Sequence, residues 1–206
     1  HALAEGFRAS LADRARFVGD PDHQPVDVEA LISDARMAQR RNQISLGRTH
    51  AIPRFSQEEH GTHHLVTADS HGNVVSLTTT VNRGFGAKLM AEASGVVLND
   101  ELNDYADTAQ ALAFGLAQSP NRPLPGSRPV SSMTPTLVVK SGKAVLAAGG
   151  SGGMTIATNV AQTVISQLTF GIPPAELVAA PRFQVPTEGA FIAVEESTPK
   201  PHIVDL

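Results

Sequence analysis

A glycine followed by a threonine, Gly61-Thr62, is the first feature of the chain that could do chemistry. The pair stands where a polar segment, RFSQEEHG, meets a segment with strand-like alternation, THHLVTAD. If the bond between the two residues broke, the new α-amine of Thr62, with a reference pKa of about 7.7–8.0, could take the proton of the threonine's own hydroxyl. The pair also fits a plain turn followed by a β-forming residue. The dipeptide alone leaves a self-cleaving nucleophile and a structural role open.

A second threonine lies where it could reach this hydroxyl. In a β-hairpin that starts at Thr62, strict alternation puts Thr78 and Thr80 of the second strand on one face. Thr80 could then meet Thr62 across the strand pair. The run of threonines at 78–80 fits a strand selected for β propensity equally well.

Three histidines near the same point invite a zinc hypothesis. They are His60, His63 and His64. Neighbouring residues of a strand point to opposite faces, so His63 and His64 are poorly placed to share one ion. We therefore expect a packing role for these histidines and no metal.

The glycine-rich segment GGSGG at 149–153 directly precedes a predicted helix. Bare N–H groups at that position lie where the helix dipole favours negative charge. The segment lacks the Lys-Ser/Thr pair of a phosphate-binding P-loop and the spacing GxGxxG. We expect Gly152 and Gly153 to form an oxyanion hole rather than a phosphate site.

The elements that must position these residues follow from hydrophobic periodicity. Helices are predicted over 1–18 and 27–43, with Asp27 capping the second, and residues 44–61 have no periodicity. From Thr62 the period changes to two, which predicts the hairpin. Further elements predicted from the pattern are strands at 95–99, 135–140, 143–149 and 191–195, a helix at 156–169, and a loop over 106–128.

Composition bounds the class of protein. With 206 residues, 41% of them hydrophobic, the chain can bury one substantial core in one or two domains. A net charge of -4 and a pI near 6.0 argue against nucleic acid or a membrane surface as partner. The absence of cysteine excludes disulfides and thiol catalysis. No apolar run reaches the length of about 18 residues that a spanning helix needs, so we expect no membrane span.

Several motifs occur in a fixed order along the chain. They are THHLVTADSHGNVVSLTTTVNRGFG from Thr62, ASGVVLNDELNDY at 93–105, RPVSSMTPTLV at 128–138, GGSGG at 149–153 and APRF at 180–183. This series resembles the small subunit of γ-glutamyltransferases, a family of N-terminal-nucleophile hydrolases. The upstream segment LADRARFVGDPDHQPVDVEALISDARMAQRR resembles the closing helices of their large subunit. The resemblance covers essentially the whole chain, and we expect the chain to be a piece of a longer precursor.

The resemblance implies roles for individual residues. Thr62 would be the nucleophile, released by cleavage after Gly61, and Thr80 would hydrogen-bond it. Gly152 and Gly153 would form the oxyanion hole.

The resemblance also implies a donor site. Asn82, Glu101 and Asp104 would hold the donor's α-ammonium group, which needs oxygen acceptors and negative charge. Ser131 and Ser132 would bind its α-carboxylate through their hydroxyls. On residue types alone, the acidic residues also fit a solvated loop and the serines an ordinary turn.

The sequence departs from the family pattern in two places, at one residue and at a pair. His63 and the pair Arg83-Gly84 replace residues that are commonly small and hydroxylated in the family. The preferred acceptor and substrate are therefore left open.

The fold implied by the resemblance is α+β, part of the four-layer αββα sandwich of N-terminal-nucleophile hydrolases, preceded by a helical hairpin. Residues 1–43 would end the large subunit, 44–61 would be a flexible linker to the processing site, and 62–206 would be the catalytic part of the small subunit. The large-subunit region upstream would be the partner, and it would supply an arginine for the donor's carboxylate.

The implied activity is hydrolysis or transfer of γ-glutamyl groups from glutathione-like donors to water, an amino acid or a peptide, without a cofactor. Two alternatives stay open: a related amidohydrolase of the cephalosporin acylase or poly-γ-glutamate depolymerase type, and an unprocessed scaffold protein. The family suggests a periplasmic or extracellular location, and the sequence leaves a cytoplasmic one open.

Overall fold

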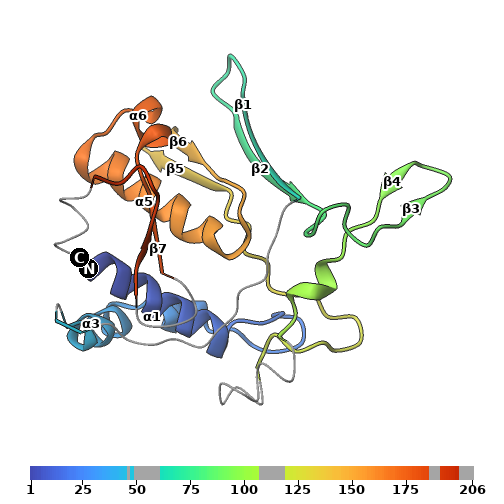
Figure 1. Ribbon diagram of the computed structural model, residues 1–206, viewed down its shortest axis with the longest axis horizontal. Helices are drawn as coiled ribbons and strands as arrows, with labels where there is room; N and C mark the ends of the chain where they lie inside the picture. Colours follow the sequence, from blue (N-terminus) through green and yellow to red (C-terminus); the bar gives the residue numbers. More distant parts are fainter. Residues whose placement is uncertain (46, 49–60, 107–118, 186–190, 200–206) are drawn as a thin grey trace. The chain divides into compact units, whose positions relative to one another are not determined.

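The computed structural model describes residues 1–45, 47–48, 61–106, 119–185 and 191–199 (Figure 1). Most of the predicted linker and of the predicted loop lies outside the described residues, as does His60. Helices and strands both occur along the chain, so the predicted α+β class is confirmed.

Most predicted elements are present with slightly different limits. The predicted hairpin, the strands near 136 and 143 and the helix from 156 are confirmed, whereas the short strands at 90 and 183 and the helix at 174 were not predicted. In chain order the elements are α1 (Ala2–Phe17), α2 (Val28–Leu31), α3 (Asp34–Gln43), β1 (Thr62–Ala68), β2 (Val74–Thr80), β3 (Met90–Ala91), β4 (Val96–Val97), the 3-10 helix η1 (Glu101–Asp104), β5 (Thr136–Lys140), β6 (Lys143–Ala148), the 3-10 helix η2 (Gly153–Thr155), α5 (Ile156–Phe170), α6 (Pro174–Ala179), β7 (Phe183–Gln184) and β8 (Ala193–Val194).

The chain forms two compact units that are discontinuous in sequence. Unit 1 holds residues 1–56, 102–131 and 183–206, and therefore α1 to α3, β7 and β8. Unit 2 holds residues 57–101 and 132–182, and therefore β1 to β6, η2, α5 and α6.

Unit 1 is built around α1. The ring of Phe7 stacks on that of Phe183 in β7, with the ring centroids 5.7 Å apart, and Ala4 and Ala15 are buried on the same helix. The buried guanidinium of Arg8 donates a hydrogen bond to the carbonyl of Phe191. Helix α1 thus joins the beginning of the chain to segments around Phe183 and Phe191 in one core.

The predicted helix 27–43 is divided in two. Asp27 caps α2 as predicted, because its carboxylate accepts a hydrogen bond from the N–H of Ala30 at 2.9 Å. Ser33 then takes an extended conformation, with φ -64° and ψ 150°, and its hydroxyl caps α3 by accepting from the N–H of Arg36 at 3.2 Å. A serine in this position competes with helix continuation by bonding the backbone itself, which is why one predicted helix became two.

A carboxylate joins two distant segments of unit 1. Asp20, which is 5% exposed, accepts hydrogen bonds from the backbone N–H of Arg128 at 2.7 Å and from its guanidinium at 2.8 Å. The hydrogen bonds from Arg128 hold the pKa of Asp20 well below its usual value.

We expect this link to make the stability of unit 1 pH-dependent. Because the folded pKa of Asp20 is depressed, its contribution is present above the unfolded pKa of about 3.9 and is lost as the pH falls below it. Asp20→Asn should lower the melting temperature near pH 6, and the difference from wild type should shrink towards pH 3, as measured by thermal unfolding of the full-length protein. An equal difference at both pH values would contradict this account.

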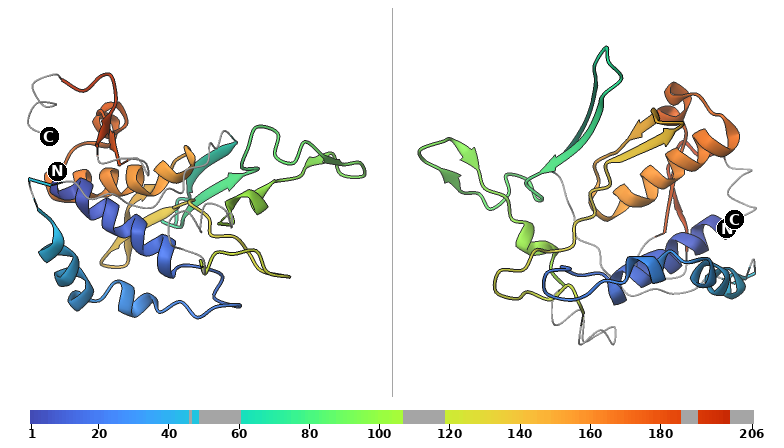
Figure 2. Two further views of the ribbon diagram at one scale, coloured as in Figure 1. Left: turned by 60° about the horizontal axis from the view of Figure 1, so that its bottom comes forward. Right: turned by 180° about the vertical axis from the view of Figure 1, so that it is seen from behind.

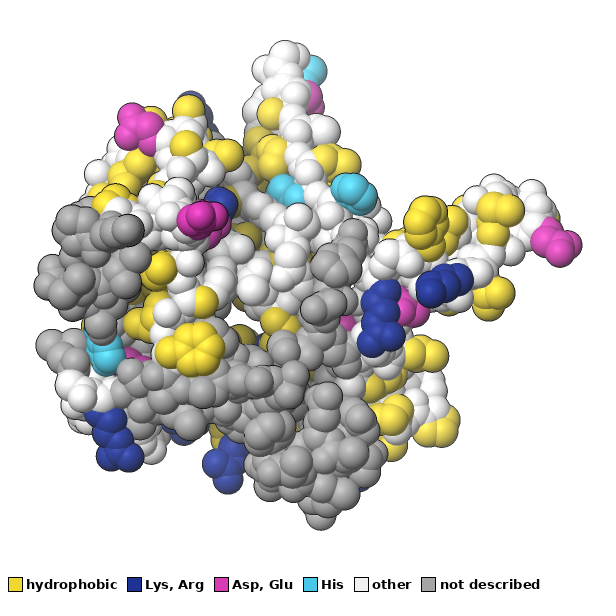
Figure 3. Space-filling view, viewed as in Figure 1, with side chains coloured by type: hydrophobic (Ala, Val, Ile, Leu, Met, Phe, Trp, Pro, Cys, Tyr) yellow, Lys and Arg dark blue, Asp and Glu magenta, His cyan; other side chains and the backbone are white. Residues whose placement is uncertain are grey.

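Unit 2 begins with the hairpin of β1 and β2, which pair antiparallel from Thr62 opposite Thr80 to Ala68 opposite Val74. The turn is closed by Asp69, whose N–H donates to the carbonyl of Asn73 at 3.1 Å, and Gly72 there has φ 88°, a conformation that favours glycine. Hydrophobic side chains on this hairpin are exposed to solvent (Figure 3), namely Leu65, Val66, Val75 and Leu77.

The second half of unit 2 packs a helix on a hairpin. Strands β5 and β6 pair antiparallel, and α5 lies along them in both views of Figure 2 and contacts β6. The predicted apolar stripe of α5 is buried at its beginning, at Ile156 and Val160, whereas Leu168 near its end is exposed. Gly171 ends the helix in the left-handed conformation, with φ 66°.

The predicted four-layer αββα sandwich is not formed by the described residues. Every sheet among them is a pair of antiparallel strands: β1 with β2, β3 with β4, β5 with β6, and β7 with β8. Such pairs leave strand edges open and cannot by themselves make two packed sheet layers. No helix in the described part of the chain has both the length and the apolar character that crossing a membrane requires.

Candidate active site

The hydroxyls of Thr62 and Thr80 form the centre of the candidate site. Thr62 is the first residue of β1, is 7% exposed, and lies directly opposite Thr80 in the register of the hairpin. Directly opposite residues of an antiparallel pair project from the same face. The Oγ1 of Thr62 accordingly donates a hydrogen bond of 3.0 Å to the Oγ1 of Thr80. The hydroxyl of Thr62 therefore has a fixed direction.

The turn that follows β2 gives the Thr80 hydroxyl a second hydrogen-bond partner. The backbone N–H of Asn82 donates to the Oγ1 of Thr80 at 2.8 Å. Asn82 is fully buried and has φ 70°, a left-handed conformation that asparagine tolerates better than most residues. Its carbonyl accepts a hydrogen bond of 3.0 Å from the N–H of Gly61. The turn therefore contacts Gly61 directly, through the carbonyl of Asn82. It contacts Thr62 through the Oγ1 of Thr80, which accepts from the Thr62 hydroxyl.

Gly61 lies where a side chain would force its neighbours to shift. A Cβ there would lie 2.9 Å from a methyl group of Val81 and 3.1 Å from the carbonyl oxygen of Asn82. The close approach of two backbone segments explains the glycine at this position.

The loop that contains Glu101 is bound to the same turn. The N–H of Asp100 donates to the carbonyl of Val81 at 3.2 Å, and its carboxylate accepts from the N–H of Arg83 at 3.1 Å. The side-chain amide of Asn82 donates to the carbonyl of Asp100 at 3.4 Å. Glu101, half-buried, is therefore attached next to Asn82, and their joint role at an ammonium site stays a prediction. Asp100 was not among the predicted site residues, and its type alone gave no signal of this linking role.

The two glycines before α5 have the backbone that a turn into a helix needs. Gly152 has φ 121° and Gly153 has φ 59°, and Gly153 is the buried first residue of η2. The hydroxyl of Thr155 donates to the carbonyl of Gly152 at 2.7 Å. Ser132, 8% exposed, lies against this turn, because its Oγ donates to the Sδ of Met154 at 3.1 Å. The structure thus brings Ser132 to the glycine turn.

Two of the predicted donor-site residues belong to unit 1. Asp104 lies in η1, where its carbonyl accepts a hydrogen bond of 2.7 Å from the side chain of Asn121, and Ser131 is exposed. Their grouping with Thr62 stays a prediction.

The two histidines of β1 that the structure describes point to different faces. His63 is exposed and His64 is half-buried, as alternation predicts. Within the described residues no three carboxylates or histidines are grouped so that they could hold a metal ion.

An open cleft of about 390 Å³ lies beside Gly61. Its walls come from Gly61, from the adjacent end of the hairpin, from the following turn and from β4. The lining residues are Gly61, His63, Thr79, Thr80, Val81, Gly84, Phe85 and Val97. The cleft leaves space next to the proposed cleavage point.

A family model described as gamma-glutamyltranspeptidase matches residues 1–206. The chain belongs to the gamma-glutamyltranspeptidase family. Thr62, Thr80 and Asn82 all lie within the matched residues.

Curated relatives of the gamma-glutamyltranspeptidase family are similar over most of this chain. The glutathione hydrolase proenzyme of Escherichia coli is 35% identical over 189 residues, which are 88% of this chain and 33% of that protein. Glutathione hydrolase proenzyme 1 of Schizosaccharomyces pombe is 36% identical over 92% of this chain and 30% of its own length. The chain spans about one third of the length of these relatives.

Solved structures show the same local fold. The T380A mutant of Helicobacter pylori gamma-glutamyltranspeptidase has a TM-score of 0.58 and 28% identity, covering 69% of this chain and 77% of that one. Cephalosporin acylase from Bacillus halodurans has a TM-score of 0.79 and 24% identity, covering 96% of this chain and 34% of that one. The second likeness concerns the fold alone. Both likenesses support the α+β class of the chain.

Proposed function

We propose that the complete protein is a self-processing γ-glutamyl hydrolase or transferase whose nucleophile is Thr62. The observation that carries this proposal is the hydrogen bond of 3.0 Å between the hydroxyls of Thr62 and Thr80, directly after Gly61. Curated relatives are named glutathione hydrolase proenzymes, which supports both a glutathione-like substrate and processing of a precursor.

Self-cleavage would use the same hydroxyl as catalysis. The Oγ1 of Thr62 attacks the carbonyl carbon of Gly61, and the bond from that carbon to the nitrogen of Thr62 breaks after the nitrogen takes a proton. The resulting ester is hydrolysed by water, which leaves a carboxylate on Gly61 and a free α-amine on Thr62. That amine then serves as the general base of the mature enzyme.

Turnover would proceed through an acyl-enzyme. The α-amine of Thr62 takes the proton of the hydroxyl, and Oγ1 attacks the γ-carbonyl carbon of the donor. The N–H groups of Gly152 and Gly153 would stabilise the negative oxygen. The departing amine takes the proton, and water or an acceptor amine then attacks the ester and restores the hydroxyl. Two half-reactions predict ping-pong kinetics.

Donor recognition would rest on opposite charges at two ends of the substrate. In this proposal Asn82, Glu101 and Asp104 bind the α-ammonium group, and Ser131 and Ser132 bind the α-carboxylate. The attachment of the Glu101 loop to the Asn82 turn supports the first of these sets.

The rest of the protein would complete the fold. We propose that 1–43 ends the large subunit, that 44–61 links it to the cleavage point, and that 62–206 belongs to the small subunit. Regions outside this chain would add strands to its hairpins and so build the αββα sandwich. The exposed hydrophobic side chains of β1 and β2 support this, because large apolar surfaces usually contact another element.

Two donors that differ in one group test the substrate. The matured full-length protein should turn over a γ-glutamyl anilide with a kcat/KM about 100-fold higher than a glutaryl anilide, which lacks the α-ammonium group. The reason is that charge-assisted hydrogen bonds contribute about 1.5–3 kcal/mol each. A preference for the glutaryl donor would favour the acylase type of activity, and no turnover of either donor by folded protein would favour a scaffold.

A further inference from the structure

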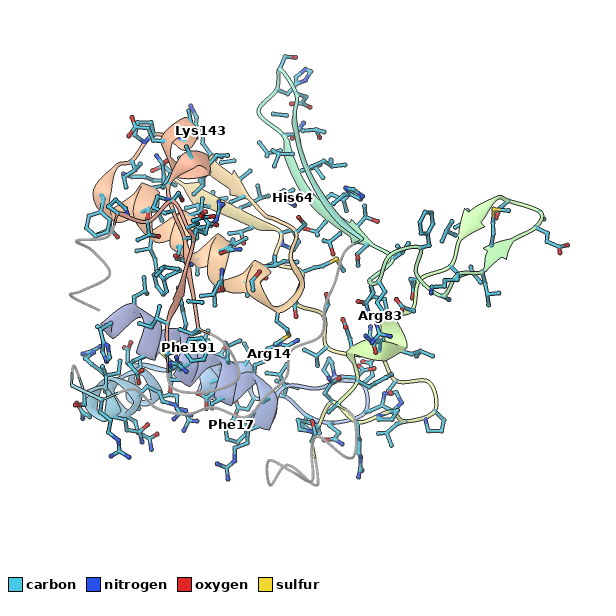
Figure 4. All side chains as sticks on the ribbon, viewed as in Figure 1. Arg14, Phe17, His64, Arg83, Lys143 and Phe191 are labelled. Atoms are coloured by element: carbon cyan, nitrogen blue, oxygen red, sulfur yellow. The ribbon has the colours of Figure 1, made fainter. Side chains whose placement is uncertain are left out.

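His64, labelled in Figure 4, lies two residues after Thr62 in β1. Strand alternation therefore puts the two side chains on the same face. The half-buried imidazole is held by two hydroxyls of β2. Its Nδ1 lies 2.9 Å from the Oγ1 of Thr78, and its Nε2 lies 3.5 Å from the Oγ of Ser76. The ring therefore has little freedom to move away from the hairpin.

The other side of the imidazole lies against Gly149, the first residue after β6. A Cβ on Gly149 would be 2.2 Å from both Nδ1 and Cε1 of His64 and 2.6 Å from Cγ. Gly149 is not among the glycines with left-handed backbone angles, so it is the ring and not the backbone that leaves no room for a Cβ unless the ring shifts. The hydroxyl of Ser76 adds a second link to this point by donating to the carbonyl of Ala148 at 3.4 Å.

The contact joins the two catalytic segments of unit 2. One side of it is the strand that begins with Thr62. The other side is the segment that reaches Gly152 and Gly153 three and four residues later. The packing of the imidazole on Gly149 therefore limits how closely the start of the glycine segment can approach the strand of Thr62.

We propose that His64 is a positioning residue, which fixes the distance between the Thr62 hydroxyl and the N–H groups of Gly152 and Gly153 by packing on Gly149. This role rests on the proposed function. Its hydrogen bonds go to Ser76 and Thr78, and no contact with the Thr62 hydroxyl is among those described, so its effect would be on geometry and not on proton transfer.

A double-mutant cycle on the full-length protein tests the proposal. Gly149→Ala should lower kcat for a γ-glutamyl anilide by about 100-fold, because a shift of about 1 Å in a reacting group can cost that much. His64→Ala should lower kcat by about tenfold, since the turn loses its support. The double variant His64→Ala/Gly149→Ala should recover at least about tenfold over Gly149→Ala, because the new methyl group then occupies the space of the ring. KM should stay within about threefold in each variant, since donor contacts are unchanged.

His71→Ala is the matched control, because His71 is an exposed histidine at the tip of the same hairpin and should have wild-type kcat. The melting temperature of each variant is measured to establish that it is folded at the assay temperature. A kcat of His64→Ala within twofold of wild type would overturn the proposal. This single-variant test remains decisive if Gly149→Ala yields no folded protein. A double variant that is no better than Gly149→Ala would overturn it too. A folded wild type with no turnover would instead overturn the proposed function, and this role with it.

Discussion

Replacing Thr62 with alanine is expected to lower turnover of a γ-glutamyl anilide by at least about 10³-fold, which corresponds to a loss of about 4 kcal/mol in transition-state stabilisation. The change removes the only atom proposed to attack the donor. It also removes the hydroxyl that donates to Thr80 at 3.0 Å. The measurement is steady-state kinetics on the full-length protein.

Thr62→Ser is the control for this substitution. Serine keeps a hydroxyl and, after cleavage, an α-amine, so activity should stay within about 10²-fold of wild type. Turnover by Thr62→Ala at more than a tenth of the wild-type rate would exclude Thr62 as the nucleophile.

Replacing Thr80 with valine is the second change with a large expected effect. Valine has nearly the same shape but accepts no hydrogen bond, so both the Thr62 hydroxyl and the N–H of Asn82 lose the acceptor they now share. We expect kcat to fall by about 10–10²-fold, because the nucleophile is no longer oriented. We also expect the free energy of unfolding to fall by about 1–3 kcal/mol, because a buried N–H donor loses its hydrogen-bond acceptor.

Two further variants make this result specific. Thr80→Ser keeps the oxygen and should retain most activity. Thr67→Val makes the same chemical change at an exposed position of β1 and should change neither kcat nor stability measurably. Wild-type kinetics of Thr80→Val would contradict the orienting role.

The sequence predicted those parts of the site that follow from strand periodicity. The alternation after Thr62 and the turn at Gly72 determined the hairpin, and the hairpin places Thr80 opposite Thr62. The helix beginning at Ile156 was predicted for the same reason, since a period of 3.6 is visible in the residues themselves.

Features that depend on contacts between distant residues could not be predicted. The division of the second helix at Ser33 follows from a single hydroxyl that bonds the backbone, which periodicity does not report. The left-handed conformation of Asn82 and its connection to Asp100 arise from a turn that is closed by residues 18 positions apart. The packing of His64 on Gly149 joins residues from separate segments, and the periodicity within either segment does not report it.

The central claim is that Thr62 cuts its own chain and thereby becomes the catalytic N-terminus. Intact-mass spectrometry of the full-length protein and of its Thr62→Ala variant, after incubation at neutral pH, tests it most directly. We predict two fragments for the wild type, with the new N-terminus at Thr62, and one uncut chain for the variant. A folded wild type that stays in one piece, or a variant that is cut at the same bond, would contradict the account.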